Sequence, residues 1–409
     1  MKTSAALVSL AALLLACGSE PPVPAPAPAP GSGGGGSGGS NAGSSGMAGE
    51  GGTSAGTGGS AGSAGAAGGG AGGTSGAGGS GAQGCHAPAT EAEQPMLLSE
   101  TACIDMTDPT KPAAGLIPYD VSSALWSDGA VKERFVSIPA GSQIHVKNCT
   151  TEPDTCVPPE MGGSGADEGH WGMPVGTVLV KNFSVDGKRI ETRLLIQMAL
   201  NTWKGFSYEW NEAGTDATLL PGELDKDLGT QVWHYPSRSQ CLECHTKGAG
   251  RSLGPTTAQM NRDFAYADGT MNQIAKFEAL GLFDTTPEMI PGYPDPKGTA
   301  PLEERVFSYL QTNCSICHRP GGTLSDIDFR FITPFAEKDL CNVPIIRGTG
   351  DPLLPQVRLV PGAPEESSIS FRMHDTTDYR MPRIGSNVVD PDGAALIDEW
   401  ITGMTDCPP

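Results

Sequence analysis

The chain has 409 residues, too many for one ordinary domain, and carries a formal net charge of −20 from 26 basic and 46 acidic residues. Such an acidic chain does not fit a nucleic-acid-binding protein or a protein held to anionic lipid by charge. The charge suits solubility or docking to a basic partner.

The N-terminus predicts export and lipid anchoring. Lys2 precedes an apolar run from Ala5 to Ala16, which is typical of a signal peptide and too short to cross a bilayer. The run ends in Leu-Leu-Ala-Cys17, which resembles a bacterial lipobox and implies cleavage after residue 16 and acylation of Cys17. The alternative is a secretory signal with an incidental cysteine. We expect a lipid-anchored protein of the cell envelope, with the outer membrane and periplasm favoured.

Residues 17–84 are expected to form a tether. Pro-Ala repeats occupy 21–30, and 31–84 are almost entirely Gly, Ser and Ala. Neither stretch has apolar side chains that could offset the entropy of ordering, so we expect disorder. The Gly-rich part has an average reach of about 40 Å. It would let the folded part move above a membrane, or it is a spacer without further role.

Two Cys-x-x-Cys-His motifs carry the chemistry, and in an exported chain they are typical of covalently attached haem c. The two thiols form thioethers with the porphyrin, and the histidine ligates the iron. The alternatives are zinc held by four cysteines and a thioredoxin-type disulfide. The separation of about 70 residues and the histidine after each pair favour two haem c groups. The predicted haem-binding residues are Cys241, Cys244, His245, Cys314, Cys317 and His318.

Six cysteines remain once Cys17 and the motif cysteines are set aside, which suggests three disulfides in an exported protein. Six cysteines allow 15 pairings. The simplest set joins Cys85 to Cys103 and Cys149 to Cys156, and so leaves Cys341 with Cys407.

Residues 298–409 are predicted to form a second cytochrome c-like domain. Apolar residues at helical spacing predict a helix over Leu302–Asn313, directly before Cys314. A second helix follows Asp390, which can cap it, and ends near Gly403. Between the helices, Met381 precedes a proline and is the candidate second iron ligand. Methionine ligation raises the reduction potential of the iron, which suits a haem that accepts electrons. The alternatives for this ligand are Met373 and His374.

Residues 232–297 are predicted to hold the first haem, in a region with one helix over Met271–Leu280. Four residues are candidates for the second ligand of this iron: Met260, Met271, Met198 and His234. The iron could also stay five-coordinate and bind small ligands or reduce peroxide.

Residues 85–231 are predicted to form an antiparallel β-sandwich. Strand-like stretches cover 132–138, 143–148, 177–185, 190–198 and 206–210. Asp186-Gly187 predicts a hairpin turn. Trp126, Trp171, Trp203 and Trp210 could form a carbohydrate-binding face, although core packing is the more common use of tryptophan. His145 and His170 are isolated, which predicts structural or exposed side chains.

Several runs together resemble a family of bacterial di-haem c-type cytochromes. They are Leu125–Ala130, Pro174–Lys181, Ile190–Leu194, Trp233–His245 and Gln259–Arg262. The resemblance covers most of 103–404 and implies electron transfer but no substrate. The family pattern has leucine where this chain has Met260, so Met260 is a weak candidate ligand.

The sequence therefore predicts an exported, lipid-anchored electron carrier that is not itself an enzyme. It would take electrons from an extracytoplasmic dehydrogenase and pass them to a respiratory partner. Its partners would be redox proteins, basic ones in particular, and not nucleic acid. One alternative is a di-haem peroxidase or oxidase that works at an open first haem. Another is a surface ligand-binding protein with haem.

Overall fold

The computed structural model describes residues 84–105, 107–147 and 169–408. All of them belong to one compact unit. Several predicted features lie outside the described residues: the signal peptide 1–16, the lipid site Cys17, the tether up to residue 83, and the pair Cys149–Cys156.

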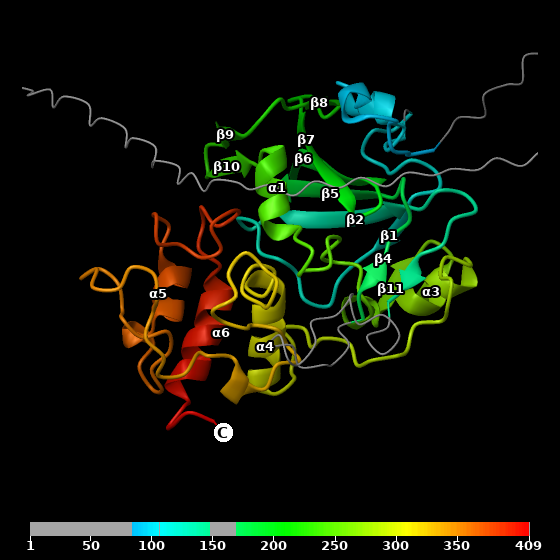
Figure 1. The fold of residues 1–409 in the computed structure, drawn as a ribbon. Helices are drawn as coiled ribbons and strands as arrows, with labels where there is room; N and C mark the ends of the chain where they lie inside the picture. The colour runs from blue at the N-terminus through cyan, green and yellow to red at the C-terminus, as the bar shows by residue number, and fades with distance from the viewer. Residues whose placement is uncertain (1–83, 106, 148–168, 409) are drawn as a thin grey trace, which may run out of the picture. The chain divides into compact units, whose positions relative to one another are not determined.

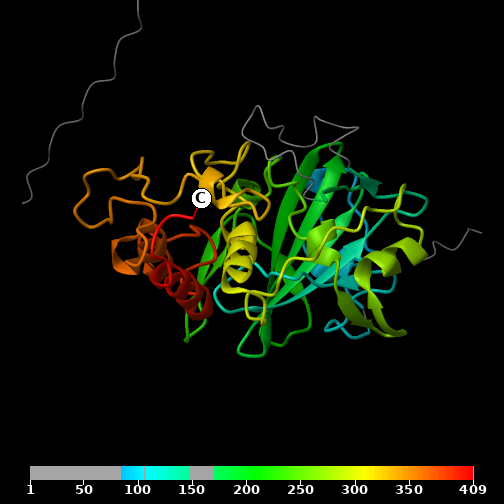
Figure 2. The same cartoon turned by 90° about the horizontal axis from the view of Figure 1, so that it is seen from below.

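A six-stranded antiparallel sheet is the main feature, with strand order β1-β2-β5-β6-β7-β8 (Figures 1 and 2). Its strands are β1 Ile117–Tyr119, β2 Val131–Ser137, β5 Val178–Val185, β6 Lys188–Ala199, β7 Thr202–Trp210 and β8 Ala217–Leu219. The predicted hairpin turn joins β5 to β6, with positive φ at both Asp186 (49°) and Gly187 (75°). These angles match the two-residue turn that fits the twist of a hairpin.

The other described strands form three small antiparallel pairs. They are β3 His145–Val146 with β4 Trp171–Gly172, β9 Leu224–Asp227 with β10 Val232–Tyr235, and β11 Asp263–Tyr266 with β12 Gly269–Asn272. The α-helices are α1 Arg238–Cys244, α2 Thr257–Met260, α3 Gln273–Ala279, α4 Leu302–Asn313, α5 Ser368–His374 and α6 Pro391–Thr402.

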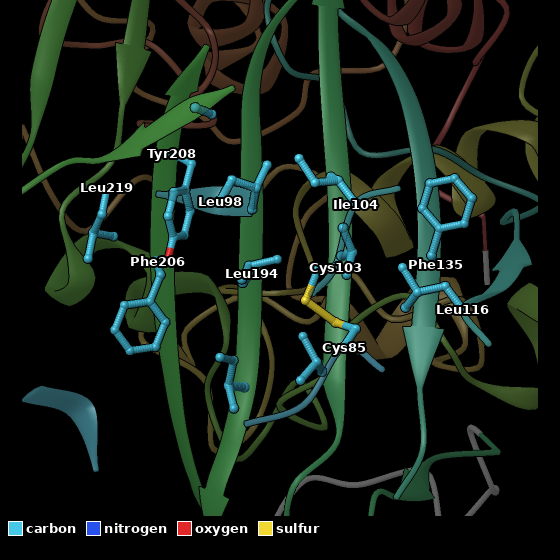
Figure 3. Packing of buried hydrophobic residues seen from close by; sticks show 14 of the residues in the cluster. Cys85, Leu98, Cys103, Ile104, Leu116, Phe135, Leu194, Phe206, Tyr208 and Leu219 are labelled. Atoms are coloured by element: carbon cyan, nitrogen blue, oxygen red, sulfur yellow. A yellow bond between two sulfur atoms is a disulfide. The ribbon is translucent and has the colours of Figure 1, made fainter. Parts of the chain in front are cut away.

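The N-terminal described segment covers one face of the large sheet. Leu98, Cys103 and Ile104 pack against apolar side chains of β2, β5, β6 and β7 (Figure 3). The Cys85–Cys103 disulfide is part of this cluster, so one predicted pairing is confirmed. This face is therefore covered by buried apolar side chains.

The opposite face carries a second apolar cluster at one end of the strands. Leu179 and Leu195 of the sheet belong to the same cluster as Trp171 and as Phe277 of α3. The rings of Trp171 and Phe283 meet edge to face at a centroid distance of 4.9 Å. At the other end of the strands, Phe183 of β5 packs with Trp233 and Tyr235 of β10. Lys181 lies between Leu179 and Phe183 along β5 and lines a cavity together with Cys241 of the first Cys-x-x-Cys-His motif.

The C-terminal helices pack around a core of their own. Helices α4 and α6 lie side by side (Figure 1). Val306 and Leu310 of α4 and Ile397 and Ile401 of α6 are each 0% exposed and belong to one cluster. Gly393 of α6 lies directly against the Tyr309 ring, where a side chain would collide. Both predicted helices are confirmed, α4 over the predicted range and α6 with the Asp390 carboxylate accepting from the Gly393 N–H at 3.1 Å.

The Cys341–Cys407 disulfide joins the loop after α4 to the segment after α6, as predicted. It ties together parts of the chain that are 66 positions apart. Both disulfides of the described residues therefore follow the simplest pairing.

The β-sandwich prediction is wrong in one respect. The strands of 117–219 form a single large sheet, and the described part of the chain has no second large sheet facing it. Loops and helices supply the second layer instead. The tryptophan-lined binding face is not formed either, because Trp171, Trp203 and Trp210 are at most 5% exposed and belong to the core clusters.

Across the same described ranges, none of the helices combines the length and apolar character needed to cross a membrane.

Candidate functional site

The segment 119–130 joins the sheet to both predicted haem regions. The Trp126 backbone N–H donates to Asn313 Oδ1 of α4 at 2.7 Å, and its ring N–H donates to the Val388 carbonyl at 2.9 Å. Gln259 accepts from the Ser123 N–H at 2.9 Å and donates to Thr312 Oγ1 of α4, also at 2.9 Å. These bonds place both motifs beside the same face of the sheet.

The first motif begins inside α1. Ser237 caps this helix through its bond with the Gln240 N–H at 3.3 Å, and the Gln240 side chain accepts from the Ser237 N–H at 2.8 Å. This reciprocal pair is a capping box, which fixes where the helix starts. Cys241 is 7% exposed and lies against Gly205 of β7, where an added Cβ would be 2.6 Å from Cys241 Sγ.

His245 follows α1 and has one ring nitrogen engaged. Its Nδ1 is 2.5 Å from the carbonyl oxygen of Arg251. A bond from Nδ1–H to a carbonyl fixes the ring and leaves Nε2 as the free lone pair, which is the usual second-shell arrangement of a metal-binding histidine. Burial lowers the pKa of His245 to about 4, and the positive charges of Lys181 and Arg193 add to the shift. The ring is therefore neutral at neutral pH and able to act as a ligand.

The second motif continues from the end of α4. The His318 N–H donates to the Cys314 carbonyl at 2.9 Å, and its ring meets Phe329 edge to face at 5.5 Å. Burial lowers the pKa of His318 to about 4, so this ring is also neutral at neutral pH. Among the described residues, His318 Nδ1 is buried and has no hydrogen-bond partner.

The two motifs touch each other although they are about 70 residues apart in the chain. Cys317 Sγ lies 3.6 Å from the Glu243 carbonyl oxygen, and the Thr323 hydroxyl donates to the same oxygen at 3.2 Å. The neighbouring thiol of Cys317 raises the pKa of Cys244, and that of Cys244 lowers the pKa of Cys317. Behind the thiols, a Cβ on Gly248 would be only 2.5 Å from the Gly321 carbonyl oxygen. Groups attached at Cys244 and Cys317 would therefore be neighbours.

The four motif thiols are free, whereas the other described cysteines are paired in disulfides. Burial raises the pKa of Cys314 to about 12 and also raises that of Cys241. Thioredoxin-type motifs need a thiol of lowered pKa, so these two cysteines do not fit that alternative.

A cavity lies between the first motif and the sheet. It contains about 1520 Å³ of space free of protein atoms, much of which is open to solvent. Cys241, Cys244 and His245 line it on one side, and Leu179 and Leu195 on the other. It extends to the second motif, where Ile316 and Arg319 line it.

These observations fit haem c at the first motif. Two free thiols, a neutral histidine with Nδ1 bonded to a carbonyl, and a large cavity with apolar walls meet at one place. The second motif has the same donor set, with two free thiols and a buried neutral histidine. Across the described ranges there is no group of three or more His, Cys, Asp or Glu side chains placed to hold a metal ion by themselves.

The structure separates the candidates for the second ligand of the first haem. Met260 is fully buried in the cluster with Trp171. Met198 packs against the cluster on the opposite face of the sheet, and Met271 is 42% exposed on β12. None of these methionines lines the cavity, whereas His234 does, with its Nδ1 2.6 Å from Asp225.

His170 was not among the predicted ligands, yet it lines the same cavity. It pairs with Thr256 in an isolated β-bridge, and its ring lies against Gly250 in the loop after His245. No local sequence pattern indicates this position, because His170 is 75 positions before His245. His145, also predicted to be structural or exposed, bonds Asp284 at 2.5 Å and is 48% exposed.

The candidates for the second iron also differ in their surroundings. Met373 is 8% exposed within the core of the C-terminal helices, and His374 Nε2 bonds Asp398 at 2.7 Å. Met381 is half-buried in the loop between α5 and α6, where its backbone N–H donates to the Arg372 carbonyl at 2.9 Å. Of the three candidates, Met381 is therefore the one that neither belongs to the core of the C-terminal helices nor bonds a carboxylate.

A comparison with protein-family models, with curated proteins and with solved structures gives no match. The site's chemistry is therefore argued from the residues of this chain alone.

Proposed function

We propose that this protein is an exported di-haem c-type cytochrome whose two covalently held haems relay electrons. The observation that carries the proposal is the close approach of two Cys-x-x-Cys-His motifs whose four thiols are free, with Cys317 Sγ 3.6 Å from the Glu243 carbonyl oxygen. Signal peptide, lipid anchor and envelope location are part of the proposal, and the disulfides are compatible with an extracytoplasmic compartment. The mixed helical region would be a cytochrome c-like domain, supported by the close crossing of α4 and α6 at Gly393.

Each part of the chain would have a definite task. Cys241, Cys244, Cys314 and Cys317 would form the thioethers, and His245 and His318 would supply proximal nitrogens. Met381 would be the second ligand at the second site. The haem irons supply one-electron redox chemistry when bound. The carbonyl of Arg251 holds the His245 ring, which is how a protein sets a ligand's orientation and basicity.

The contact between the motifs favours relay over two independent sites. Cys244 and Cys317 would bring the attached groups next to each other, so an electron could pass between them without a protein partner. The acidic surface, with a net charge of −20 for the chain, would suit a basic redox protein as donor or acceptor.

One observation favours a second candidate, a peroxidase or oxidase. None of Met198, Met260 and Met271 lines the cavity next to His245. If His234 and His170 also stay away from the iron, the first haem would have an open position where a small ligand could bind.

The first experiment is a haem count and a spectrum of the full chain expressed in a host that matures c-type cytochromes. We expect two covalent haems per chain and, in electron paramagnetic resonance, magnetic coupling between the two ferric irons. A chain that carries no covalent haem would refute the proposal. A carbon monoxide shift in half of the haem, together with peroxide turnover, would favour the second candidate.

Gly248→Ala tests the contact itself. The added methyl would meet the Gly321 carbonyl oxygen at 2.5 Å and its carbon at 2.6 Å, and backbone atoms cannot rotate away. We expect two haems but weaker magnetic coupling than in the wild type. Gly222→Ala is the matched control, because nothing lies within 4 Å of its added Cβ. Unchanged coupling in Gly248→Ala would contradict the relay through this contact.

A further inference from the structure

The cavity beside the first motif has a charge opposite to that of the protein. Its lining includes four cationic side chains, Arg134, Lys181, Arg193 and Arg319, and one carboxylate, Asp128. The whole chain has 46 acidic residues against 26 basic ones. Burial raises the pKa of Asp128, which weakens even this one negative charge. Burial and the neighbouring cations lower the pKa of Lys181 well below its usual value, so the lining lacks negative charge and a bound anion would favour the charged lysine.

Three of the cations form a row across adjacent strands. Arg134 of β2 pairs in register with Lys181 of β5, and Lys181 pairs with Arg193 of β6. Like charges directly opposite each other destabilise a sheet. Burying a charge without a counter-ion adds a further cost. A row of this kind is therefore expected only where a bound anion neutralises part of its positive charge.

Among the described residues, carboxylates form ion pairs only with the two cations at the ends of the row. Asp120 accepts from Arg134 at 2.6 Å, and Glu191 lies 2.8 Å from Arg193. Lys181, in the middle, has no carboxylate partner among the described residues, and its ammonium lies 5.0 Å from the centre of the Phe183 ring. Neither Asp120 nor Glu191 lines the cavity, so the side of the row that faces the cavity stays positive.

We infer that the row Arg134–Lys181–Arg193 binds carboxylate groups, and that these are the propionates of the haem attached at the first motif. The inference rests on the proposed function, because it needs a haem in this cavity. The row faces the same cavity as Cys241, Cys244 and His245, so a group bonded to the motif and its carboxylates would share one enclosed space. A haem carries two carboxylates, which suits a row with one unpartnered and two half-neutralised cations.

The test uses the full chain with both haems attached and changes only the central cation. In Lys181→Met we expect a lower reduction potential for one haem, because a nearby positive charge disfavours the ferric state. We also expect shifted propionate bending bands in the resonance Raman spectrum. Lys181→Arg should restore both towards the wild type. Lys188→Met is the control, since Lys188 is exposed on the same sheet and lies outside the cavity lining.

The outcomes separate the inference from the proposed function. Two covalent haems with unchanged potentials and propionate bands in Lys181→Met would overturn the inference and leave the proposed function standing. A chain without haem would refute the proposed function itself. The row could instead hold a soluble anion: if added phosphate shifts the wild-type potential and Lys181→Met abolishes this shift, the propionate assignment is wrong.

Discussion

Gly205 is the position where the packing of the first motif can be tested most directly. It lies on β7 opposite Leu195, and an added Cβ would be 2.6 Å from Cys241 Sγ and 2.8 Å from Cys241 Cβ. Both distances are far inside van der Waals contact. Cys241 cannot move away easily, because α1 is fixed by its cap and the sulfur would be bonded to the haem.

The size of the effect of Gly205→Ala follows from two opposing contributions. Overpacking a filled site costs about 1–3 kcal/mol. Replacing glycine by alanine inside a strand regains about 0.5–1 kcal/mol. The net loss in the free energy of unfolding spans about 0–2.5 kcal/mol, and the 2.6 Å approach to a fixed sulfur favours its upper part, about 1–2.5 kcal/mol. This corresponds to a decrease in Tm of about 2–10 °C at about 2–4 °C per kcal/mol.

Calorimetry of the haem-loaded protein and a haem count would measure this effect. We expect Gly205→Ala to lower Tm and to reduce haem attachment at the first motif, while Gly222→Ala changes neither. If Gly205→Ala kept two haems and the Tm of the wild type, Cys241 could not be packed against β7 as described.

Two further predictions concern the C-terminal region. Met381→Ala should leave the haem count unchanged and abolish the methionine–iron charge-transfer band of the oxidised spectrum. Met373→Ala should keep the band but lose about 2–5 kcal/mol of stability, because it truncates a core side chain. A band that persists in Met381→Ala would show that another residue is the ligand. Burial lowers the pKa of Lys338 to about 8, below the value of about 10.4 expected when unfolded, so the unfolded chain binds more protons between these values and stability should rise with pH there. Urea unfolding at several pH values should show a steeper rise in the wild type than in Lys338→Met, and equal slopes would refute the prediction. Part of the rise should remain in the variant, because burial also lowers the pKa values of Lys132 and Lys181.

Local patterns predicted much of the secondary structure. The helix over Leu302–Asn313 is found over the same residues, because apolar periodicity and the following motif define both ends. The strand ending at Trp210 begins earlier than predicted, at Thr202, since Gly205 weakens the strand pattern there. The helix predicted to start at Met271 is shorter in the structure. Met271 belongs to β12, where it pairs with Phe264 of β11, and the helix starts after the Asn272 cap.

The candidate site was predicted only in part. The six proposed haem-binding residues follow from spacing alone, since the motif is defined by neighbours in the chain. The approach of Cys317 to Glu243 could not be predicted, because it results from how two distant loops meet. The row of cations was equally hidden: Lys181 and Arg193 become neighbours only once the register of β5 and β6 is known.

The bonds made by residues 119–130 have a consequence for how the chain can be divided. Trp126 donates hydrogen bonds to the Asn313 side chain and the Val388 carbonyl. Ser123 donates to the Gln259 side chain and the Ser308 carbonyl. A fragment that begins after the sheet would leave these buried polar groups without partners, at a cost of about 1–3 kcal/mol for each. The C-terminal helices, although they have their own apolar core, are thus not a module that can be cut out and moved to another protein. The part of the chain from residue 84 onward should melt in a single transition, and inheritance of the region with the two Cys-x-x-Cys-His motifs would require inheritance of the sheet.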